Sequence, residues 1–204
     1  MAIFEFNGIK PVVSKTAFVH PQATVIGDVI IGEDVYIGPG AVLRGDWGAI
    51  RVANGSNIQE NCIVHMFPGV TVTFEKNSHI GHGAIIHGAT IGENSLIGMA
   101  AVLMDNVVIG RECIIGALSF LKEGTQIADR KVVVGNPARI VKDVSDEMIE
   151  WKNEGTRLYQ TLPELMRDTL KVCEPLREII KQEPLQKTNY SSWKSTEKEL
   201  GRRT

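Results

Sequence analysis

Large aliphatic residues recur at intervals of six along much of this chain. The later series runs without a gap through Ile91, Ile97, Leu103, Ile109, Ile115 and Leu121. An earlier series runs through Val19, Val25, Ile31, Ile37 and Leu43. An α-helix repeats its apolar face every 3.6 residues and a lone strand every two, so neither produces this interval. A triangular coil with three six-residue sides does, because each side turns one apolar residue inward.

The positions between these residues favour the same fold. In the earlier series the residue four places after each aliphatic residue is mostly small or β-branched, and in the later series Gly follows four of them, at Gly92, Gly98, Gly110 and Gly116. Glycine suits a tight corner that restricts the backbone. A β-sandwich is the alternative, but it predicts irregular strands and longer turns. We therefore predict a mainly β fold, a left-handed parallel β-helix of hexapeptide repeats over residues 1–141, with a lead-in strand in about the first 15.

The apolar period changes after residue 141. Ser145 can cap a helix that begins with Asp146 and Glu147, whose negative charge suits a helix N-terminus. Pro163 can open a second helix, because proline is favoured in the first helical turn. We expect C-terminal α-helices within residues 142–183 that pack on the outside of the β-helix, followed by a polar, mobile tail over 184–204.

The composition restricts the partners. Lys and Arg number 22 against 24 Asp and Glu, a formal net charge of -2, so no general attraction for nucleic acid or an anionic membrane is expected. The longest apolar stretch, 96–104, is far shorter than the roughly 18 residues that span a bilayer. The first residues lack the pattern of a signal peptide, which favours the cytoplasm. Cys62, Cys113 and Cys173 are odd in number and widely spaced, unlike a disulfide framework or a metal knuckle.

Three of the five histidines fall where the six-residue period breaks. Three sides of six complete one regular coil, and the spacing of His65 and His82 is close to one such coil, so they should lie near one another in successive coils. Five extended residues span about 16 to 18 Å, so His82 and His87 need a sharp bend to reach one ion. The economical arrangement is a homotrimer in which His65 and His87 of one chain, stacked across coils, meet His82 of its neighbour. The alternative is three surface or turn histidines without a metal; His20 and His79 are expected to be structural.

Three imidazoles with one open coordination position make zinc catalytic. The ion lowers the pKa of its bound water to about 7 and so supplies hydroxide at neutral pH. Imidazole also suits cobalt and iron, so the ligands alone do not select the metal. We expect Zn²⁺ between the subunits, with Co²⁺ or Fe²⁺ as alternatives.

Three motifs carry a family resemblance: RGDWGAIRV at 44–52, NIQENCIVH at 57–65 and NSHIGHGAIIHGATIG at 77–92. They resemble the γ-class carbonic anhydrase family of left-handed β-helix trimers, over most of residues 10–160. The resemblance implies one zinc at each subunit interface, held by His65, His82 and His87, with His82 contributed by the neighbouring chain.

The same resemblance implies roles for five further residues. Arg44 and Asp46 match an ion pair that joins subunits beside the metal, although an exposed pair would contribute only about 0 to 1 kcal/mol. Gln59 matches a side chain that orients the metal-bound water or the substrate oxygen. Asn57 lines the same pocket or caps the strand ladder. Tyr159 matches a helix tyrosine whose hydroxyl reaches the site, with core packing as the alternative.

The chain departs from the archaeal members of that family at two positions. Trp47 and Pro68 stand where those members have glutamates that relay protons. Hydration of CO2 releases a proton at every turnover, so the sequence predicts slow or absent carbonic anhydrase activity. An apolar Trp47 at the mouth of the site suits an acyl or aromatic group better than CO2.

A closer resemblance is to a bacterial branch that contains phenylacetate-degradation proteins of the PaaY type and carnitine-operon proteins of the CaiE type. Its marks are GDVIIGEDVYIGP at 27–39, WKNEGTRLYQ at 151–160 and EPLREI at 174–179, and MFPG after His65, together with EPLREI, favours the PaaY type. That type implies a thioesterase that cleaves a ring-derived acyl-coenzyme A in phenylacetate catabolism. The alternatives are a weak carbonic anhydrase, a CaiE-like protein, a metal-free hexapeptide acyltransferase and a trimeric scaffold.

Overall fold

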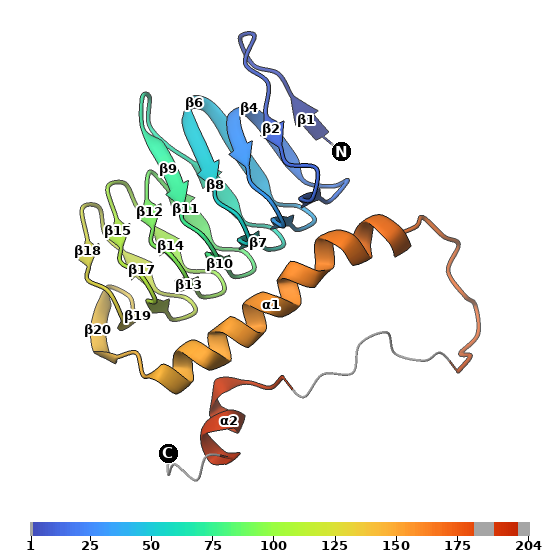
Figure 1. The fold of residues 1–204 in the computed structure, drawn as a ribbon. Helices are drawn as coiled ribbons and strands as arrows, with labels where there is room; N and C mark the ends of the chain where they lie inside the picture. Colours follow the sequence, from blue (N-terminus) through green and yellow to red (C-terminus); the bar gives the residue numbers. More distant parts are fainter. Residues whose placement is uncertain (1, 182–189, 200–204) are drawn as a thin grey trace.

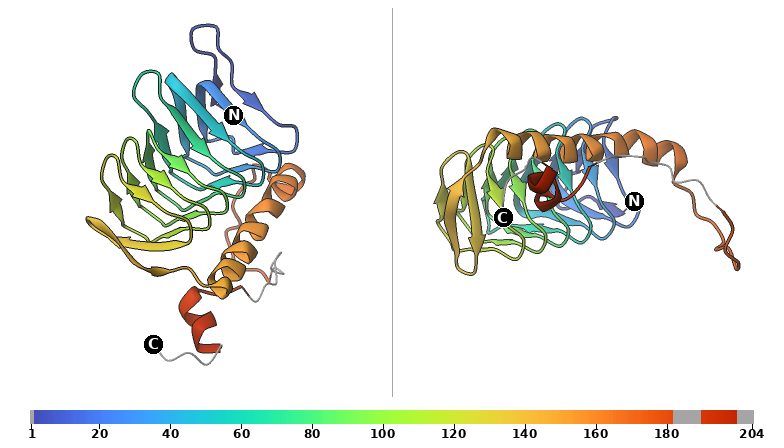
Figure 2. Two further views of the ribbon diagram at one scale, coloured as in Figure 1. Left: turned by 60° about the vertical axis from the view of Figure 1, so that its left-hand side comes forward. Right: turned by 90° about the horizontal axis from the view of Figure 1, so that it is seen from below.

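The computed structural model describes residues 2–181 and 190–199. Short strands wind into a parallel β-helix, and one long helix, α1 (Asp146–Thr169), crosses its outside from the last coils to the first (Figures 1 and 2). A second short helix, α2 (Trp193–Glu199), lies beside the start of α1. The predicted β-helix with a C-terminal helix is confirmed.

Two sheets form the three sides of the coil. The larger sheet has 12 strands and bends at β4 and β6, whose two halves pair with different neighbours, so it supplies two sides. Its strands are β1 (Ala2–Phe4), β2 (Val12–Val13), β4 (Thr24–Ile31), β6 (Val42–Val52), β8 (Ile63–His65), β9 (Thr71–Phe74), β11 (Ile85–His87), β12 (Thr90–Ile91), β14 (Val102–Leu103), β15 (Val108–Ile109), β17 (Phe120–Leu121) and β18 (Gln126–Ile127).

The third side is a sheet of eight strands, all parallel except the last pair. They are β3 (Phe18–Val19), β5 (Tyr36–Ile37), β7 (Asn57–Ile58), β10 (His79–Ile80), β13 (Leu96–Ile97), β16 (Ile114–Ile115), β19 (Lys131–Gly135) and β20 (Ala138–Asp143). Helix α1 contacts this side at β3, β5 and β7.

The aliphatic residues of the six-residue series fill the core. Ile97 pairs with Ile115 and Leu103 with Leu121, so each pairs with the member of the series three places further on, and all four are buried. Burying each such side chain stabilises the fold by roughly 1.5 to 3 kcal/mol. The interval of six therefore corresponds to one side of the coil, and three such intervals complete one coil.

The period breaks because some coils are longer than three sides of six. Tyr36 pairs with Asn57, three positions later than a regular coil would place the partner, and Asn57 pairs with His79, four positions later. The extra residues extend β6 to 11 residues and build the turn between β8 and β9. The second of these insertions separates His65 from His82.

Helix α1 begins as predicted and then differs. The Ser145 Oγ accepts a hydrogen bond from the Met148 N–H at 3.3 Å, which confirms the N-cap. The prediction that Pro163 opens a second helix is wrong, because α1 continues through it. Gln160 donates to the Gly55 carbonyl at 2.9 Å and Arg167 to the Thr16 carbonyl at 2.7 Å, so contacts with the β-helix hold the chain helical on both sides of the proline.

The expected polar tail also differs where the structure describes it. Tyr190 stacks on Trp151 of α1, with ring centroids 5.8 Å apart, and Trp193 of α2 lies 6.0 Å from the same ring. Residues 190–193 are therefore packed against α1. Residues 184–189 and 200–204 of the predicted tail, and residues 182 and 183 before it, lie outside the described residues.

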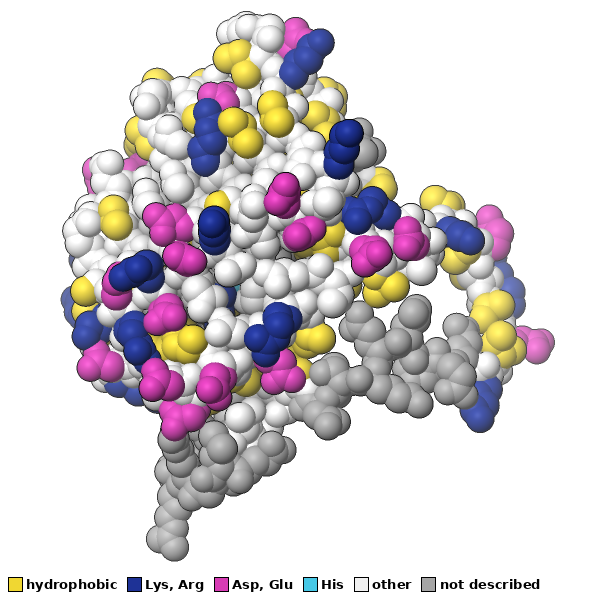
Figure 3. All heavy atoms as spheres, in the orientation of Figure 1, with side chains coloured by type: hydrophobic (Ala, Val, Ile, Leu, Met, Phe, Trp, Pro, Cys, Tyr) yellow, Lys and Arg dark blue, Asp and Glu magenta, His cyan; other side chains and the backbone are white. Residues whose placement is uncertain are grey.

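The surface shown in Figure 3 mixes acidic and basic side chains without a large region of one sign. Among the described residues, no helix is long and apolar enough to cross a membrane.

Candidate functional site

Two of the three predicted metal ligands lie side by side. His65 ends β8 and His87 ends β11, and the register pairs them directly, with ring centroids 5.4 Å apart. Both point outward because the preceding Val64 and Ile86 are buried in the core. The expectation that His65 neighbours His82 is wrong, because the insertion after β8 lengthens this coil and brings His87 into register instead.

Two aromatic rings flank this pair of histidines. The Trp47 ring lies 5.3 Å from that of His65, and the Phe67 ring lies 5.1 Å from that of His87. Trp47 and Phe67 are 53% and 55% exposed, so apolar rings that remain open to solvent border the two imidazoles.

His82 lies on another part of the coil. It follows β10, at a corner where Gly83 turns with a φ of +69°, and its Nδ1 hydrogen-bonds the Glu60 carboxylate. This corner is the sharp bend that separates His82 from His87. Among the described residues of a single chain, no three His, Cys, Asp or Glu side chains converge closely enough to hold a metal ion.

Carboxylates orient two of the imidazoles. The Asp105 Oδ1 accepts from the His87 Nδ1 at 2.7 Å, and Glu60 accepts from the His82 Nδ1. Each contact leaves the Nε2 lone pair free, which is how carboxylates orient metal-binding histidines. Sequence reasoning missed both acids, although each lies one coil away from its histidine, at sequence separations of 18 for Asp105 and 22 for Glu60.

His65 is held differently. Desolvation and the neighbouring Arg44 charge lower its pKa, so the ring is neutral. Its Nε2 then accepts a hydrogen bond from the Arg44 Nη2 at 2.9 Å, and Asp46 lies 3.1 Å from the same nitrogen. The Arg44 Nε is 3.5 Å from the Asp46 carboxylate, so this pair forms within one chain. An ion at the His65 Nε2 would require the Arg44 side chain, which is 44% exposed, to move off this nitrogen.

The remaining predicted residues gather near His82 under α1. Asn57 and Gln59 are buried, and the Gln59 Nε2 donates to the Asn57 Oδ1 at 2.9 Å. The Tyr159 ring lies 5.8 Å from that of Tyr36, whose hydroxyl donates to Glu60 at 2.9 Å. Desolvation and the Glu60 charge raise the pKa of Tyr159 to about 12, so its hydroxyl remains protonated.

The predicted site residues thus fall into two groups on one chain. We call them the histidine-pair face, which comprises Arg44, Asp46, His65 and His87, and the His82 corner, which comprises Asn57, Gln59, Glu60, His82 and Tyr159. Neither group alone has three metal ligands. Together they offer three imidazole nitrogens, a donor set that suits Zn²⁺, Co²⁺ or Fe²⁺.

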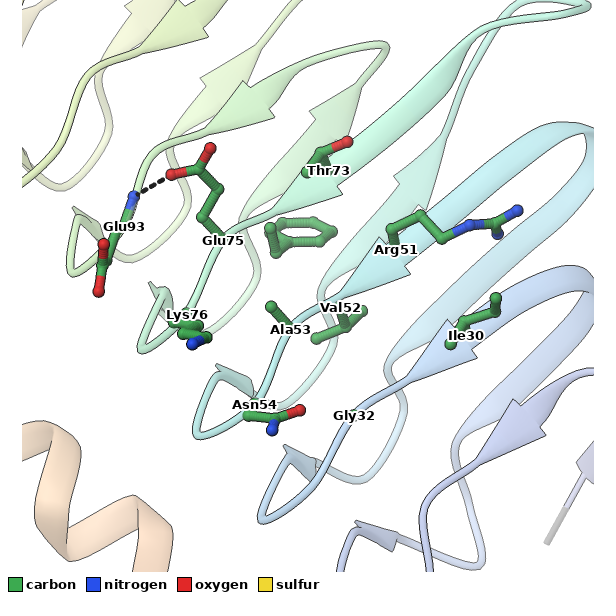
Figure 4. Close-up of a pocket in the computed structure, with 11 residues that line it drawn as sticks. Ile30, Gly32, Arg51, Val52, Ala53, Asn54, Thr73, Glu75, Lys76 and Glu93 are labelled. Carbon is green, nitrogen blue, oxygen red and sulfur yellow. Dashed lines mark hydrogen bonds between the residues drawn. The ribbon is translucent and has the colours of Figure 1, made fainter.

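Two surface hollows lie near these groups. One, of about 330 Å³, is lined by Asp46 of the histidine-pair face and by Trp47, Phe6, Ile9 and Val70. The other, of about 550 Å³, runs over β4, β6 and β9 and contains no predicted site residue (Figure 4). Its Arg51 is held by Asp28 at 2.7 Å. Of these two hollows, only the one of about 330 Å³ adjoins the histidine-pair face, through Asp46.

Comparison with known proteins adds three findings. The model of the bacterial transferase hexapeptide (six repeats) family matches residues 10–45 and 88–123, the two regions of regular period. The carnitine operon protein CaiE of Escherichia coli K12 is 47% identical over 184 residues, 90% of this chain and 94% of that protein. CaiE of Proteus sp. is also 47% identical, over 86% of this chain and 89% of that protein.

Solved structures agree on the fold. A hexapeptide transferase family protein from Anaplasma phagocytophilum superposes with a TM-score of 0.77 at 33% identity, covering 80% of this chain and 96% of that one. An acetyltransferase-family protein from Bacillus cereus gives 0.80 at 27% identity, covering 82% of this chain and 97% of that one. The first of these structures is named for a transferase family and the second for acetyl transfer.

The preference for the PaaY type is not supported by these relatives, which are named for the carnitine operon. The two motifs that favoured the PaaY type, EPLREI and MFPG, lie where the structure constrains the sequence little. EPLREI lies in the exposed, non-helical stretch after α1, and Phe67 and Pro68 of MFPG are exposed in a turn. Substitution costs little at such positions.

Proposed function

Because the chain belongs to the family of CaiE-like hexapeptide-repeat proteins, we propose that it acts as a cytoplasmic homotrimer with Zn²⁺ bound between subunits and hydrolyses a coenzyme A thioester. One observation carries the proposal. His65 and His87 lie on one part of the chain and His82 on another, so three imidazoles meet only if a second chain supplies the missing group.

An apolar surface beside the two histidines supports the trimer. Val42, Ile63, Ile85, Val102 and Phe120 form one in-register outward column across five strands. Ile63 and Ile85, on the same faces of β8 and β11 as the histidines, are 45% and 38% exposed. At the equivalent turns of the two coils that follow His82, Met99 and Leu118 are 56% and 75% exposed. Docking one surface on the other would bury both and repeat head to tail until a ring closes.

The chain's own residues set up the chemistry. Asp105 and Glu60 hold His87 and His82 with Nε2 outward, and Tyr159 keeps its proton for donation to a developing oxyanion or a leaving group. When bound, Zn²⁺ supplies Lewis acidity that activates water and polarises the thioester carbonyl. The reaction adds water across the C–S bond, yielding a carboxylate and the coenzyme A thiol.

The surroundings favour an acyl substrate over CO2. Trp47, Phe67 and the hollow of about 330 Å³ beside Asp46 provide apolar space for an acyl chain. Trp47 and Pro68 cannot relay protons, so we expect CO2 hydration to be weak. Since the relatives are carnitine operon proteins, acyl groups of the carnitine type are the first to test, with ring-derived acyl groups as the comparison.

Acyl transfer is the second candidate, and the solved neighbours of the transferase type favour it. The two activities differ in their needs. A hydrolase consumes a thioester without an amine or alcohol acceptor and depends on the metal. A metal-free transferase requires the acceptor and is indifferent to chelation.

The test combines metal analysis with a substrate panel. Protein purified anaerobically should hold about one Zn²⁺, Co²⁺ or Fe²⁺ per chain, and should hydrolyse at least one coenzyme A ester of the panel. Chelation or His82→Ala should abolish turnover. His20→Ala, outside both groups, should not. Full metal content without turnover above the chelated protein on any ester would refute the hydrolase.

A further inference from the structure

His79 sits at the centre of a polar cluster that the proposed chemistry does not yet use. It begins β10, beside Asn57 of β7 in the next coil, and faces α1. Its Nε2 lies 2.8 Å from the Gln59 Nε2 and its Nδ1 lies 3.3 Å from the Thr156 Oγ1. The Tyr159 ring meets it edge to face at 5.1 Å.

The charge state of His79 decides which atoms donate. Desolvation, with the Lys152 charge as a smaller cause, lowers its pKa to about 3, so the ring is neutral at physiological pH. The Gln59 Nε2 can only donate, so the His79 Nε2 must accept and the proton must lie on Nδ1. That proton is donated to Thr156, and the 3.4 Å approach of the Asn57 Nδ2 to Nδ1 is then a packing contact rather than a hydrogen bond.

Counting donors fixes the orientation of Gln59. Its Nε2 donates to the Asn57 Oδ1 at 2.9 Å and to the His79 Nε2 at 2.8 Å, which uses both amide protons. The Gln59 Oε1 has no hydrogen-bond partner among the described residues, and the side chain as a whole is 2% exposed. The carbonyl oxygen is therefore the end of Gln59 that remains available.

The cluster connects directly to the His82 corner. Gln59 precedes Glu60, which holds His82, and Thr156 and Tyr159 belong to α1. We propose that His79 is a positioning residue that holds the Gln59 amide through Nε2, so that Gln59 presents only an acceptor oxygen to the site and orients the attacking water instead of donating to the oxyanion. This inference rests on the proposed hydrolysis, and it assigns α1 the task of fixing the His79 tautomer.

Two substitutions separate positioning from packing. His79→Leu keeps similar bulk and removes the acceptor, whereas His79→Gln places an amide oxygen near the position of Nε2. Thr156→Val is nearly isosteric and removes only the partner of Nδ1, so it provides a milder variant should His79→Leu fold poorly. Gln59→Ala, alone and combined with each, tests whether His79 acts through Gln59.

The first readout requires no catalysis. In protein labelled with ¹⁵N in glutamine side chains, the resonance absent from Gln59→Ala identifies this amide. Its two protons should exchange slowly with solvent in the wild type and in His79→Gln. They should exchange at least about tenfold faster in His79→Leu, because a hydrogen bond is lost. Fast exchange in the wild type, or no change in His79→Leu, would overturn the proposal.

The second readout is kinetic. With bound metal unchanged, His79→Leu should lower kcat about tenfold with little effect on KM, and Gln59→Ala/His79→Leu should be no worse than Gln59→Ala. Losses that multiply in the double variant would overturn the proposal. A wild type that hydrolyses no ester refutes the proposed function, while the exchange measurement still decides whether His79 holds Gln59.

Discussion

Mixing two inactive variants should restore part of the activity if the metal site is shared between subunits. In the proposed ring, each site takes His65 and His87 from one subunit and His82 from the next. His65→Ala spoils the histidine-pair face and leaves the His82 corner intact. His82→Ala does the reverse. A site is complete wherever a His82→Ala subunit, which retains His65 and His87, meets a His65→Ala subunit, which retains His82.

The expected recovery equals the fraction of complete sites in the mixture. Every mixed trimer of the two variants contains one such junction among its three, whichever variant is in excess. A 1:1 random mixture gives about three mixed trimers in four, so about a quarter of all sites are whole. Bound metal and thioesterase activity should each recover to about 25% of the wild type.

The assay needs a matched control, and the histidine pair supplies it. His65→Ala mixed with His87→Ala cannot complement, because both residues come from the same subunit in every site. Subunits are exchanged by co-expression or by refolding together, and metal is counted per chain. Recovery in the control mixture, or none in the test mixture despite verified subunit exchange, would refute the shared site.

The remaining predictions concern stability. Ile86→Ala should lower the free energy of unfolding by about 2 to 5 kcal/mol, because Ile86 is fully buried. Ile85→Ala should lower it far less in the dissociated chain, because Ile85 faces outward. Urea titration of both variants compares the two free energies. Ser145→Ala should cost about 1 kcal/mol, since an N-cap is lost, and α1 should lose helicity by circular dichroism. Lys152 is buried against the Asn77 carbonyl, and desolvation lowers its pKa to about 7, below the unfolded value of about 10.4. Between about pH 7 and pH 10.4 the unfolded chain therefore holds a proton on Lys152 that the folded chain has lost. The contribution of Lys152 to the free energy of unfolding accordingly rises with pH across this range. Lys152→Met should remove that rise; an identical pH profile in the variant would contradict the assignment.

The β-helix was predictable from sequence because its core repeats. Ile97 and Ile115 occupy equivalent places in successive coils, so local spacing reports the three-dimensional pairing. The Ser145 cap was predictable for a similar reason, since it depends on residues three apart. Helix continuation past Pro163 was not, because contacts from Gln160 and Arg167 to distant coils override the local preference.

The site was predictable only in part. The sharp bend between His82 and His87 follows from their spacing, and the structure places them on different parts of the coil. The stacking of His65 with His87 across coils was expected for a shared site, and the register pairs them. Asp105 lies one regular coil of 18 residues from His87, so spacing could have found it. The contacts of Glu60 with His82 and of Gln59 with His79 cross a lengthened coil, which a regular repeat does not reveal. The sequence accordingly predicts a structural role for His79 but does not reveal its contact with Gln59.

The antiparallel pairing of β20 with β19 bears on how the molecule avoids polymerising. A stack of parallel coils exposes unpaired N–H and C=O groups at each end, to which another copy could add. At the final coil β20 covers β19, and Lys131 is paired with Asp143 across the two strands. At the first coil, Arg167 occupies the carbonyls of Thr16 and Ala17. Deleting residues 131–143 would uncover β16 as a template, and end-to-end fibres should replace discrete particles.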